Sequence, residues 1–421
     1  MLNTIKKYLK KFKKLLVFYY FLLILVLLLP NALTMPSLSF KSAIATAIGL
    51  DSVDNGIEIS VLTLSDISKD NTSEKTKILS AKDSNISKAI SSIEFQIDRK
   101  IRMGHVGYVV ISKALATQNV GQMLNNLIVS TNLPKTVSLV MSEDKAKDVL
   151  NLANKLEHTS SYKLREIIQN EFNENYTKDS NLDLFLKGYF SHISTSTMGS
   201  IYLSSNTDDG LNTNNEETGG NDTDNKTQQK SSSLSSNQEK SVINYKKEHA
   251  VFVDGLYKYT LSPDEMIGVN LLGENDLKQI FTINNVFTQG LENAQVTFEI
   301  KNKQIQTLIE YRNGKPIIEY DIALNINPIE IIQDNKKRLS PQELRVDEEV
   351  NQKINDQVKK YVAIAIEKMR QEKTDLINIY EILYTNSYKK FMSFLENLDI
   401  KEDFLSFVQV KIKVSSKIMT N

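Results

Sequence analysis

The side chains best suited to acid–base or metal chemistry in this chain are its four histidines. They are His105, His158, His192 and His249, and none lies at the short spacing from another that metal-binding pairs use. The sequence has no cysteine, which excludes disulfides, thiolate metal ligands and cysteine nucleophiles. It also lacks the common hydrolase, metalloprotease, phosphate-loop and dinucleotide-binding motifs. We therefore predict a structural role for each histidine, and the residues alone indicate no catalytic, metal-binding or cofactor-binding site.

Pairs of like charge are a second kind of candidate. The acid pairs Asp208-Asp209 and Glu348-Glu349 fall in a polar stretch and on a predicted helix face, where solvated charge explains both. The lysine pairs Lys359-Lys360 and Lys389-Lys390 also suit solvated helix faces. A basic patch for anionic lipid headgroups is the alternative interpretation of these lysines.

A tyrosine stripe is a third candidate. Tyr380, Tyr384 and Tyr388 recur every four residues, the spacing that places side chains on one face of a helix. Core packing is the favoured role for these rings, and a contact surface for a partner protein is the alternative.

Length and composition bound the architecture that must position these residues. A chain of 421 residues, of which 41% are hydrophobic, can bury the cores of two or three domains. Its 51 basic and 51 acidic residues give a formal charge of zero, so no net field would attract nucleic acid.

The first fifty residues predict export and membrane anchoring. The segment from Lys6 to Lys14 is rich in lysine and no acid occurs before Asp51, so this positive segment should stay in the cytoplasm. The apolar run from Leu15 to Leu29 has the length of a signal peptide core, and extending it to Met35 gives about 20 residues, enough to span a bilayer. An uncleaved transmembrane anchor is favoured because no A-x-A cleavage site is evident, and a cleaved signal is the alternative.

A break in composition divides the chain near its middle. Residues 204–240 are polar, and their only large apolar residues are Leu211 and Leu234. Such a segment cannot bury enough surface to offset the entropy of ordering it. We predict a disordered linker, with a tether for a partner as the alternative.

Before this linker, predicted strands and helices alternate. Period-two or continuous apolar patterns predict strands at 56–64, 106–111 and 136–141. Helical spacing predicts helices at 86–97, around 124–128 and at 147–156, and the stretch 162–190 is interpreted as mostly helical. Glu143-Asp144 is predicted to lie at the positive end of the third helix. The alternation is typical of a layered α/β domain.

After the linker, turn and cap signals define the elements. Asp254-Gly255 predicts a hairpin turn, and Ser262-Pro263 followed by two acids predicts a helix start. Three strands are predicted at 296–301, 305–311 and 316–327, with Asn313-Gly314 as the turn between the last two. A long helix at about 341–373 and a final strand at 408–414 complete a sheet with one face covered by the helix.

Together these patterns predict an α+β protein. Its predicted segments are 1–35, a signal or anchor; 36–158, an N-terminal α/β domain; 159–203, a helical middle domain with contributions from after the linker; 204–240, the disordered polar linker; and 241–421, a C-terminal α+β domain with a sheet packed on one long helix.

Four stretches of this chain resemble, in order and spacing, the GerAC or Ger(x)C family of spore germination proteins. They are SAIATAIGLDSVDNGIEISVLTL, GHVGYVVISKALA, HAVFVDGLYKYTLSPDEMIGVNLLGE and the run from VTFEIKNKQIQTLIE to VQVKIKV. The resemblance covers most of residues 40–418 apart from the linker.

The resemblance implies a C subunit of a nutrient germinant receptor that is not an enzyme, with three α+β domains and no recognised catalytic residues. Such subunits lie on the outer face of the spore inner membrane. They act with two polytopic, permease-like subunits, of the A and B types, when nutrients are sensed. The implied partners of this chain are those subunits and the membrane, with no cofactor and no nucleic acid.

The opening segment departs from the family pattern. Family members carry a Gly-Cys lipobox followed by Trp-Asp before the first strand, whereas this chain reads LPNALTMPSLSF there. Lipid attachment to a cysteine is therefore excluded, and a retained helix becomes the favoured anchor because one buried span holds more firmly than a single acyl chain. An exported envelope protein unrelated to germination is the alternative function, and a secreted enzyme without a recognisable motif is a further one.

Overall fold

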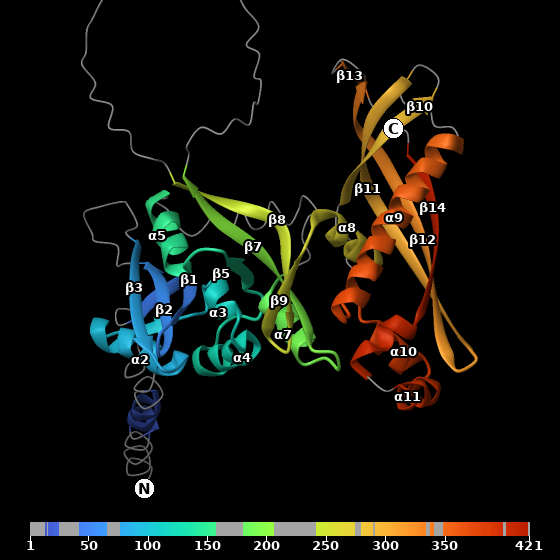
Figure 1. The fold of residues 1–421 in the computed structure, drawn as a ribbon. Helices are drawn as coiled ribbons and strands as arrows, with labels where there is room; N and C mark the ends of the chain where they lie inside the picture. The colour runs from blue at the N-terminus through green and yellow to red at the C-terminus, as the bar shows by residue number, and fades with distance from the viewer. Residues whose placement is uncertain are drawn as a thin grey trace, which may run out of the picture.

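The computed structural model describes residues 13–14, 16–24, 42–64, 76–156, 180–205, 241–273, 279–288, 291–333, 337–340, 348–398 and 401–419. Two β-sheets with helices packed on them account for most of these residues (Figure 1). Both sheets contain parallel and antiparallel pairs. The α+β class predicted from the sequence is confirmed.

The first sheet has the strand order β3-β2-β1-β5-β6-β7-β8-β9, with β4 paired to one end of β1. Its centre, β1-β5-β6-β7, is parallel, and both flanks are antiparallel. The strands predicted at 56–64, 106–111 and 136–141 are confirmed within two residues of their ends. The nine strands are β1 (Ser42–Val53), β2 (Gly56–Leu64), β3 (Thr76–Asp83), β4 (Lys100–Arg102), β5 (Tyr108–Ser112), β6 (Ser138–Ser142), β7 (Thr195–Ser205), β8 (Ser241–Val253) and β9 (Leu256–Leu261).

Helices cover both faces of this sheet, which explains the continuous apolar run of β5. Val109 and Ile111 lie in a core that includes residues of α2 (Ile86–Ile97), α4 (Val120–Thr131) and α7 (Leu182–Tyr189). Tyr108 and Val110 face the opposite core, under α5 (Ala146–Leu156). A strand buried on both faces has no solvent side and therefore no polar alternation. The short helix α3 (Lys113–Ala116) follows β5 directly.

The predicted linker separates two neighbouring strands of the first sheet. Ser205, at the end of β7, pairs with Ser241, at the start of β8, and residues 206–240 lie outside the described residues. β8 and β9 therefore follow the linker in sequence but belong to the sheet that precedes it. Part of the predicted helical segment 159–203 is strand β7, while α7 lies within the stretch 162–190. The domain boundaries inferred from the sequence stay a prediction.

The second sheet has the order β10-β11-β12-β13, with β14 also paired to β12. The long helix α9 (Glu348–Glu372) lies along it (Figure 1) and buries a stripe that includes Val350, Ile354, Val358 and Val362, as the four-residue spacing predicts. Its strands are β10 (Gln279–Thr288), β11 (Leu291–Arg312), β12 (Lys315–Gln333), β13 (Lys337–Leu339) and β14 (Gln409–Ile418). The helices α8 (Pro263–Leu272), α10 (Ile379–Asn386) and α11 (Tyr388–Glu396) and the 3-10 helix η4 (Lys401–Phe407) complete this half.

The two strands predicted at 296–301 and 305–311 form one strand, β11, so this part of the prediction is wrong. A bulge between Ile300 and Asn302 interrupts the register with β12, and pairing resumes on both sides of it. The polar residues there mimic a turn in the sequence pattern. The bulge instead changes which residues face the helix while the strand continues.

A buried carboxylate joins the first strand to helix α5. Asp51, on β1, accepts backbone N–H bonds from Ala146 at 2.8 Å and from Lys147 at 2.9 Å. Glu143 and Asp144 precede the helix as predicted, but the group that accepts its first N–H bonds lies 95 residues earlier in the sequence. Asp51 therefore caps α5 across the sheet, because these N–H groups have no partner within the helix.

Replacing Asp51 with alanine is expected to lower the free energy of unfolding by roughly 2–4 kcal/mol, since a cap is lost and two buried N–H groups lose their acceptor. Urea denaturation measures this change. Asp54→Ala, at the exposed turn after β1, is the matched control and is expected to stay within about 0.5 kcal/mol of the parent. Equal losses in the two variants would contradict the capping role.

Candidate interaction site at the joint between the two sheets

The described histidines lie on separate elements. His105 is exposed in the turn between β4 and β5. His249 is buried in β8 with its Nε2 3.2 Å from Ser180 Oγ, and His192 follows α7. His158 lies outside the described residues. Across the described part of the chain, no three His, Asp or Glu side chains gather in a way that could hold a metal ion.

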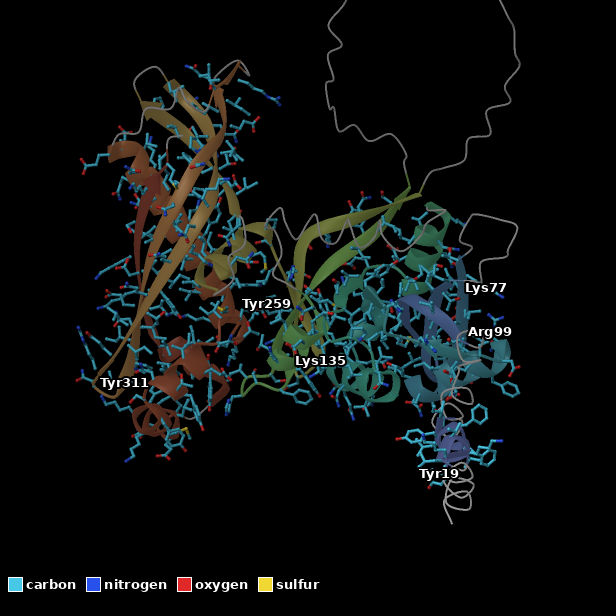
Figure 2. The ribbon with its side chains drawn as sticks, turned by 180° about the vertical axis from the view of Figure 1, so that it is seen from behind. Tyr19, Lys77, Arg99, Lys135, Tyr259 and Tyr311 are labelled. Carbon is cyan, nitrogen blue, oxygen red and sulfur yellow. The ribbon has the colours of Figure 1, made fainter. Side chains whose placement is uncertain are left out.

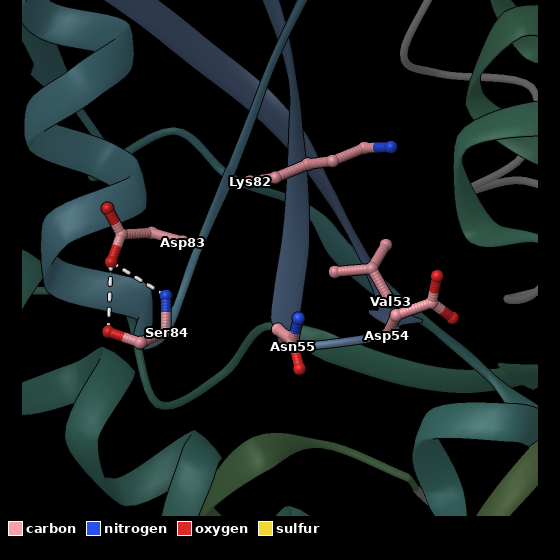
Figure 3. Close-up of a pocket in the computed structure, with 6 residues that line it drawn as sticks. All are labelled: Val53, Asp54, Asn55, Lys82, Asp83 and Ser84. Carbon is pink, nitrogen blue, oxygen red and sulfur yellow. Dashed lines mark hydrogen bonds between the residues drawn. The ribbon is translucent and has the colours of Figure 1, made fainter.

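A shallow hollow of about 320 Å³ lies where the β1–β2 turn meets the end of β3 (Figure 3). Asp83 accepts hydrogen bonds there from the backbone N–H of Ser84 at 2.6 Å and from its hydroxyl at 3.0 Å. These bonds shape the turn that leads into α2, and the other polar side chains of the hollow are exposed, so we assign it no ligand. Its lining residues are Val53, Asp54, Asn55, Lys82, Asp83 and Ser84.

A cluster at the junction of the two sheets brings together side chains from both halves of the molecule. The loop after α7 and strand β9 contribute from the first sheet, and the end of α9 and helix α10 contribute from the second. Figure 2 shows Tyr259 in this position between the two halves. We call the cluster the joint, and it consists of His192, Lys258, Tyr259, Lys368, Glu372, Thr374, Asp375, Tyr380, Glu381 and Tyr384.

His192 contacts α10 through its ring and its backbone. Its imidazole stacks on Tyr380 with ring centroids 4.9 Å apart, and lies 5.1 Å from the ring of Tyr384. Its Nδ1 lies 3.2 Å from Glu381 Oε1, which also accepts the His192 backbone N–H at 3.3 Å. Ser194, in the left-handed region with φ of 47°, turns the chain after this loop into β7. The loop that follows α7 in the first half therefore packs against one turn of α10.

The tyrosine stripe predicted as one helix face spans two helices. Tyr380 and Tyr384 lie on α10, the helix is interrupted at Ser387, and Tyr388 is the first residue of α11. The rings of Tyr384 and Tyr388 still meet at 5.1 Å, and Tyr380 packs edge-to-face on Phe391 at 5.0 Å. Ring packing within the chain accounts for these contacts. A role of the stripe in binding a partner protein stays a prediction.

Asp375 holds the start of α10. It is buried, and its carboxylate accepts the backbone N–H groups of Ile379 at 2.9 Å and Tyr380 at 2.7 Å. Asn378, the residue before the helix, is in the left-handed region and makes no capping bond with its side chain. Burial raises the pKa of Asp375 to about 6, although the two N–H bonds oppose that rise.

Strand β9 contacts the end of α9 on the other side of the joint. The Tyr259 hydroxyl lies 2.6 Å from Thr374 Oγ1, and the ammonium of Lys368 lies 4.8 Å from the centroid of the Tyr259 ring. Lys258 donates a hydrogen bond to the backbone carbonyl of Glu372. Burial raises the pKa of the Tyr259 phenol, so it stays neutral as a hydrogen-bonding group. The two sheets are therefore tied by hydrogen bonds and stacking as well as by apolar packing.

Replacing His192 with alanine is expected to increase local opening of α10 more than it lowers the stability of the whole chain. The lost ring stacking is worth roughly 1 kcal/mol, and the exposed contact of its Nδ1 with Glu381 adds little. Amide hydrogen exchange in α10 should therefore speed up about fivefold. His105→Ala is the control, and faster exchange spread evenly over both sheets would argue against a local role for His192.

Comparisons with known proteins identify the two halves. Residues 41–201 match the spore germination protein N-terminal domain, and residues 247–421 match the C-terminal domain described as spore germination B3/GerAC like. Fold and domain content thus define a spore germination protein. The chain belongs to the GerAC family, and the resemblance predicted from its sequence is confirmed.

A solved structure shares this fold. The crystal structure of the GerBC protein is similar with a TM-score of 0.50 and 14% sequence identity, over 89% of this chain and 97% of that chain. No curated protein matches the chain. The segment from residue 247 onward contains most of β8 and all of β9, which are built into the first sheet. The segment matched by the C-terminal family domain therefore contributes the β8–β9 hairpin to the first sheet as well as forming the second sheet. At the joint, the end of α9 packs against this hairpin.

Proposed function

We propose that this chain is a non-enzymatic C subunit of a nutrient-sensing spore germinant receptor. It acts on the outer face of the spore inner membrane with polytopic subunits of the A and B types. The observation that carries the proposal is the presence of both GerAC-family domains in order, in a fold shared with GerBC over nearly the whole of both chains. In this role the chain binds the other receptor subunits. The joint is the place where a conformational change in one half would reach the other, because its side chains contact both halves.

The membrane part of the proposal rests on the N-terminal segment. Residues 16–24 are helical, and their apolar side chains are all at least 46% exposed, which suits a helix surrounded by lipid. Within the described residues, no helix has both the length and the apolar character needed to cross a bilayer, and residues 25–41 lie outside that part. Mass spectrometry of the mature N-terminus tests the anchor: an intact segment from Lys6 to Leu29 supports it, and a start near Thr34 removes it.

Deleting the gene tests the receptor role directly. Spores without this chain should lose germination in response to one nutrient and keep their response to non-nutrient triggers, and the intact gene should restore the loss. Permease-like membrane proteins should co-purify with the chain from spores. Normal nutrient germination without the gene, together with no such partner, would reject the proposal and favour an envelope protein of another role.

A further inference from the structure

One end of the second sheet carries a group of cations and aromatic rings that the joint does not use. We call this end the tip. It comprises the β11–β12 hairpin end, the first turn of α11 and the end of η4, and Figure 2 shows Tyr311 at this extremity of the molecule. Its residues are Tyr311, Arg312, Lys315, Lys389, Lys390 and Phe407.

Two lysines of the tip each lie over an aromatic ring. The Lys390 ammonium lies 5.6 Å from the centroid of the Tyr311 ring, and the Lys315 ammonium lies 5.9 Å from that of Phe407. Phe407 is 44% exposed. Tyr388, next to the lysine pair, is 53% exposed. The tip thus exposes both aromatic ring surface and positive charge to solvent.

The charge of the tip is largely uncompensated. Of its four cations, Arg312 has a carboxylate partner among the described residues, Glu310 at 2.9 Å. Lys315, Lys389 and Lys390 are exposed and form no ion pair within the described part of the chain. By contrast, in the other lysine pair of this half, Lys359 lies 3.5 Å from Asp356 on the same helix. The two lysine pairs therefore differ in setting although they look alike in sequence.

We propose that the tip binds to the headgroup layer of an anionic lipid bilayer. Tyrosine and other amphipathic rings favour that layer, and lysines near it are attracted by anionic lipid. Lysine is depleted from the centres of protein interfaces, so lipid fits this surface better than a protein partner does. The inference rests on the proposed membrane location of the chain, and it adds a second contact that fixes the orientation of the second sheet relative to the membrane.

The absence of cysteine from the sequence makes a clean test possible in the full-length chain. Ser393→Cys, exposed on α11 beside the lysine pair, accepts a single spin label. Gln352→Cys, exposed near the start of α9 and so at the opposite end of the second sheet, is the control position (Figure 1). The chain is reconstituted in phosphatidylcholine vesicles with or without phosphatidylglycerol, and the immersion of each label is measured by accessibility to oxygen and to a water-soluble relaxant.

The label at position 393 should become immersed in vesicles that contain phosphatidylglycerol and should stay in water in neutral vesicles or at high salt. The double substitution Lys389→Gln and Lys390→Gln should lower the equilibrium constant for binding of the tip to the headgroup layer about thirty-fold. Lys359→Gln with Lys360→Gln is the matched control and should leave it unchanged. The label at position 352 should stay in water throughout.

Three results would overturn the proposal. Immersion that is equal in neutral and anionic vesicles would remove the electrostatic basis. An equal loss of immersion in the two double lysine variants would show that general charge attraction, and not the tip, causes the binding. Immobilisation of the label by spore membranes but not by protein-free anionic vesicles would assign the tip to a protein. Germination of spores lacking the gene is read separately, so failure of the tip and failure of the receptor role are distinguishable.

Discussion

Replacing Gly268 with alanine is expected to lower the free energy of unfolding by about 2 kcal/mol or more, because the new methyl group overpacks a helix contact. A Cβ at this position of α8 would lie 2.1 Å from the carbonyl oxygen of Tyr361 and 2.7 Å from the Cβ of Ala365, both on α9. A backbone oxygen cannot rotate away, so the helices must part. Alanine favours a helix over glycine by roughly 1 kcal/mol, and the clash outweighs that gain.

Urea denaturation of the full chain measures this prediction. Gly104→Ala is the control, since a Cβ there meets no heavy atom within 4 Å, and it should change stability by less than about 0.5 kcal/mol. Because α8 follows β9 directly and packs on α9, the Gly268 variant should also speed hydrogen exchange in the joint. A variant more stable than the parent would show that α8 and α9 can separate at no cost.

Replacing Asp375 with asparagine is expected to change how stability depends on pH. The folded pKa of Asp375, about 6, lies above the usual aspartate value of 3.8, so between these values the folded chain binds more protons than the unfolded chain. Ionisation of Asp375 therefore destabilises the fold as pH rises through this window, and asparagine cannot ionise. Relative to the parent, the variant should gain roughly 2–3 kcal/mol between pH 4 and pH 7.

Asp403→Asn provides a control of opposite sign. Hydrogen bonding from Ser406 and the charge of Lys373 hold the pKa of Asp403 below its usual value, so its carboxylate stabilises the fold above that value. The Asp403 variant should therefore lose stability relative to the parent as pH rises, while the Asp375 variant gains it. Denaturation midpoints measured at several pH values compare the two, and parallel pH profiles would contradict the assignment of Asp375.

Local signals let the sequence predict many elements. Asp254-Gly255 adopts the left-handed turn expected between β8 and β9, and Ser262 forms a capping box with Glu265 at the start of α8. The apolar stripe of α9 faces its sheet as predicted. These features depend on residues within a few positions of one another, and turn and cap chemistry is specific at that range. The same kind of signal failed at β11, where polar residues at a bulge resembled a turn.

The candidate site was only partly visible in the sequence. His192 and the tyrosine stripe lie far apart in the chain, and no sequence signal joins them or marks Asp375 as part of the same site. A weak signal for Asp375 exists, since an aspartate shortly before an apolar helix is a possible cap. Nothing local shows that it is buried, and burial is the cause of its raised pKa.

The sequence by itself determined the family, the class of fold and the order of most elements, because periodicity, turn residues and motif order are local properties of the chain. The tertiary structure alone decided that one sheet includes strands from both sides of the linker and that Asp51 caps a helix 95 residues later. It also decided that the two lysine pairs differ in setting. Each of these depends on strand register and on packing between distant segments, which no short window of sequence contains.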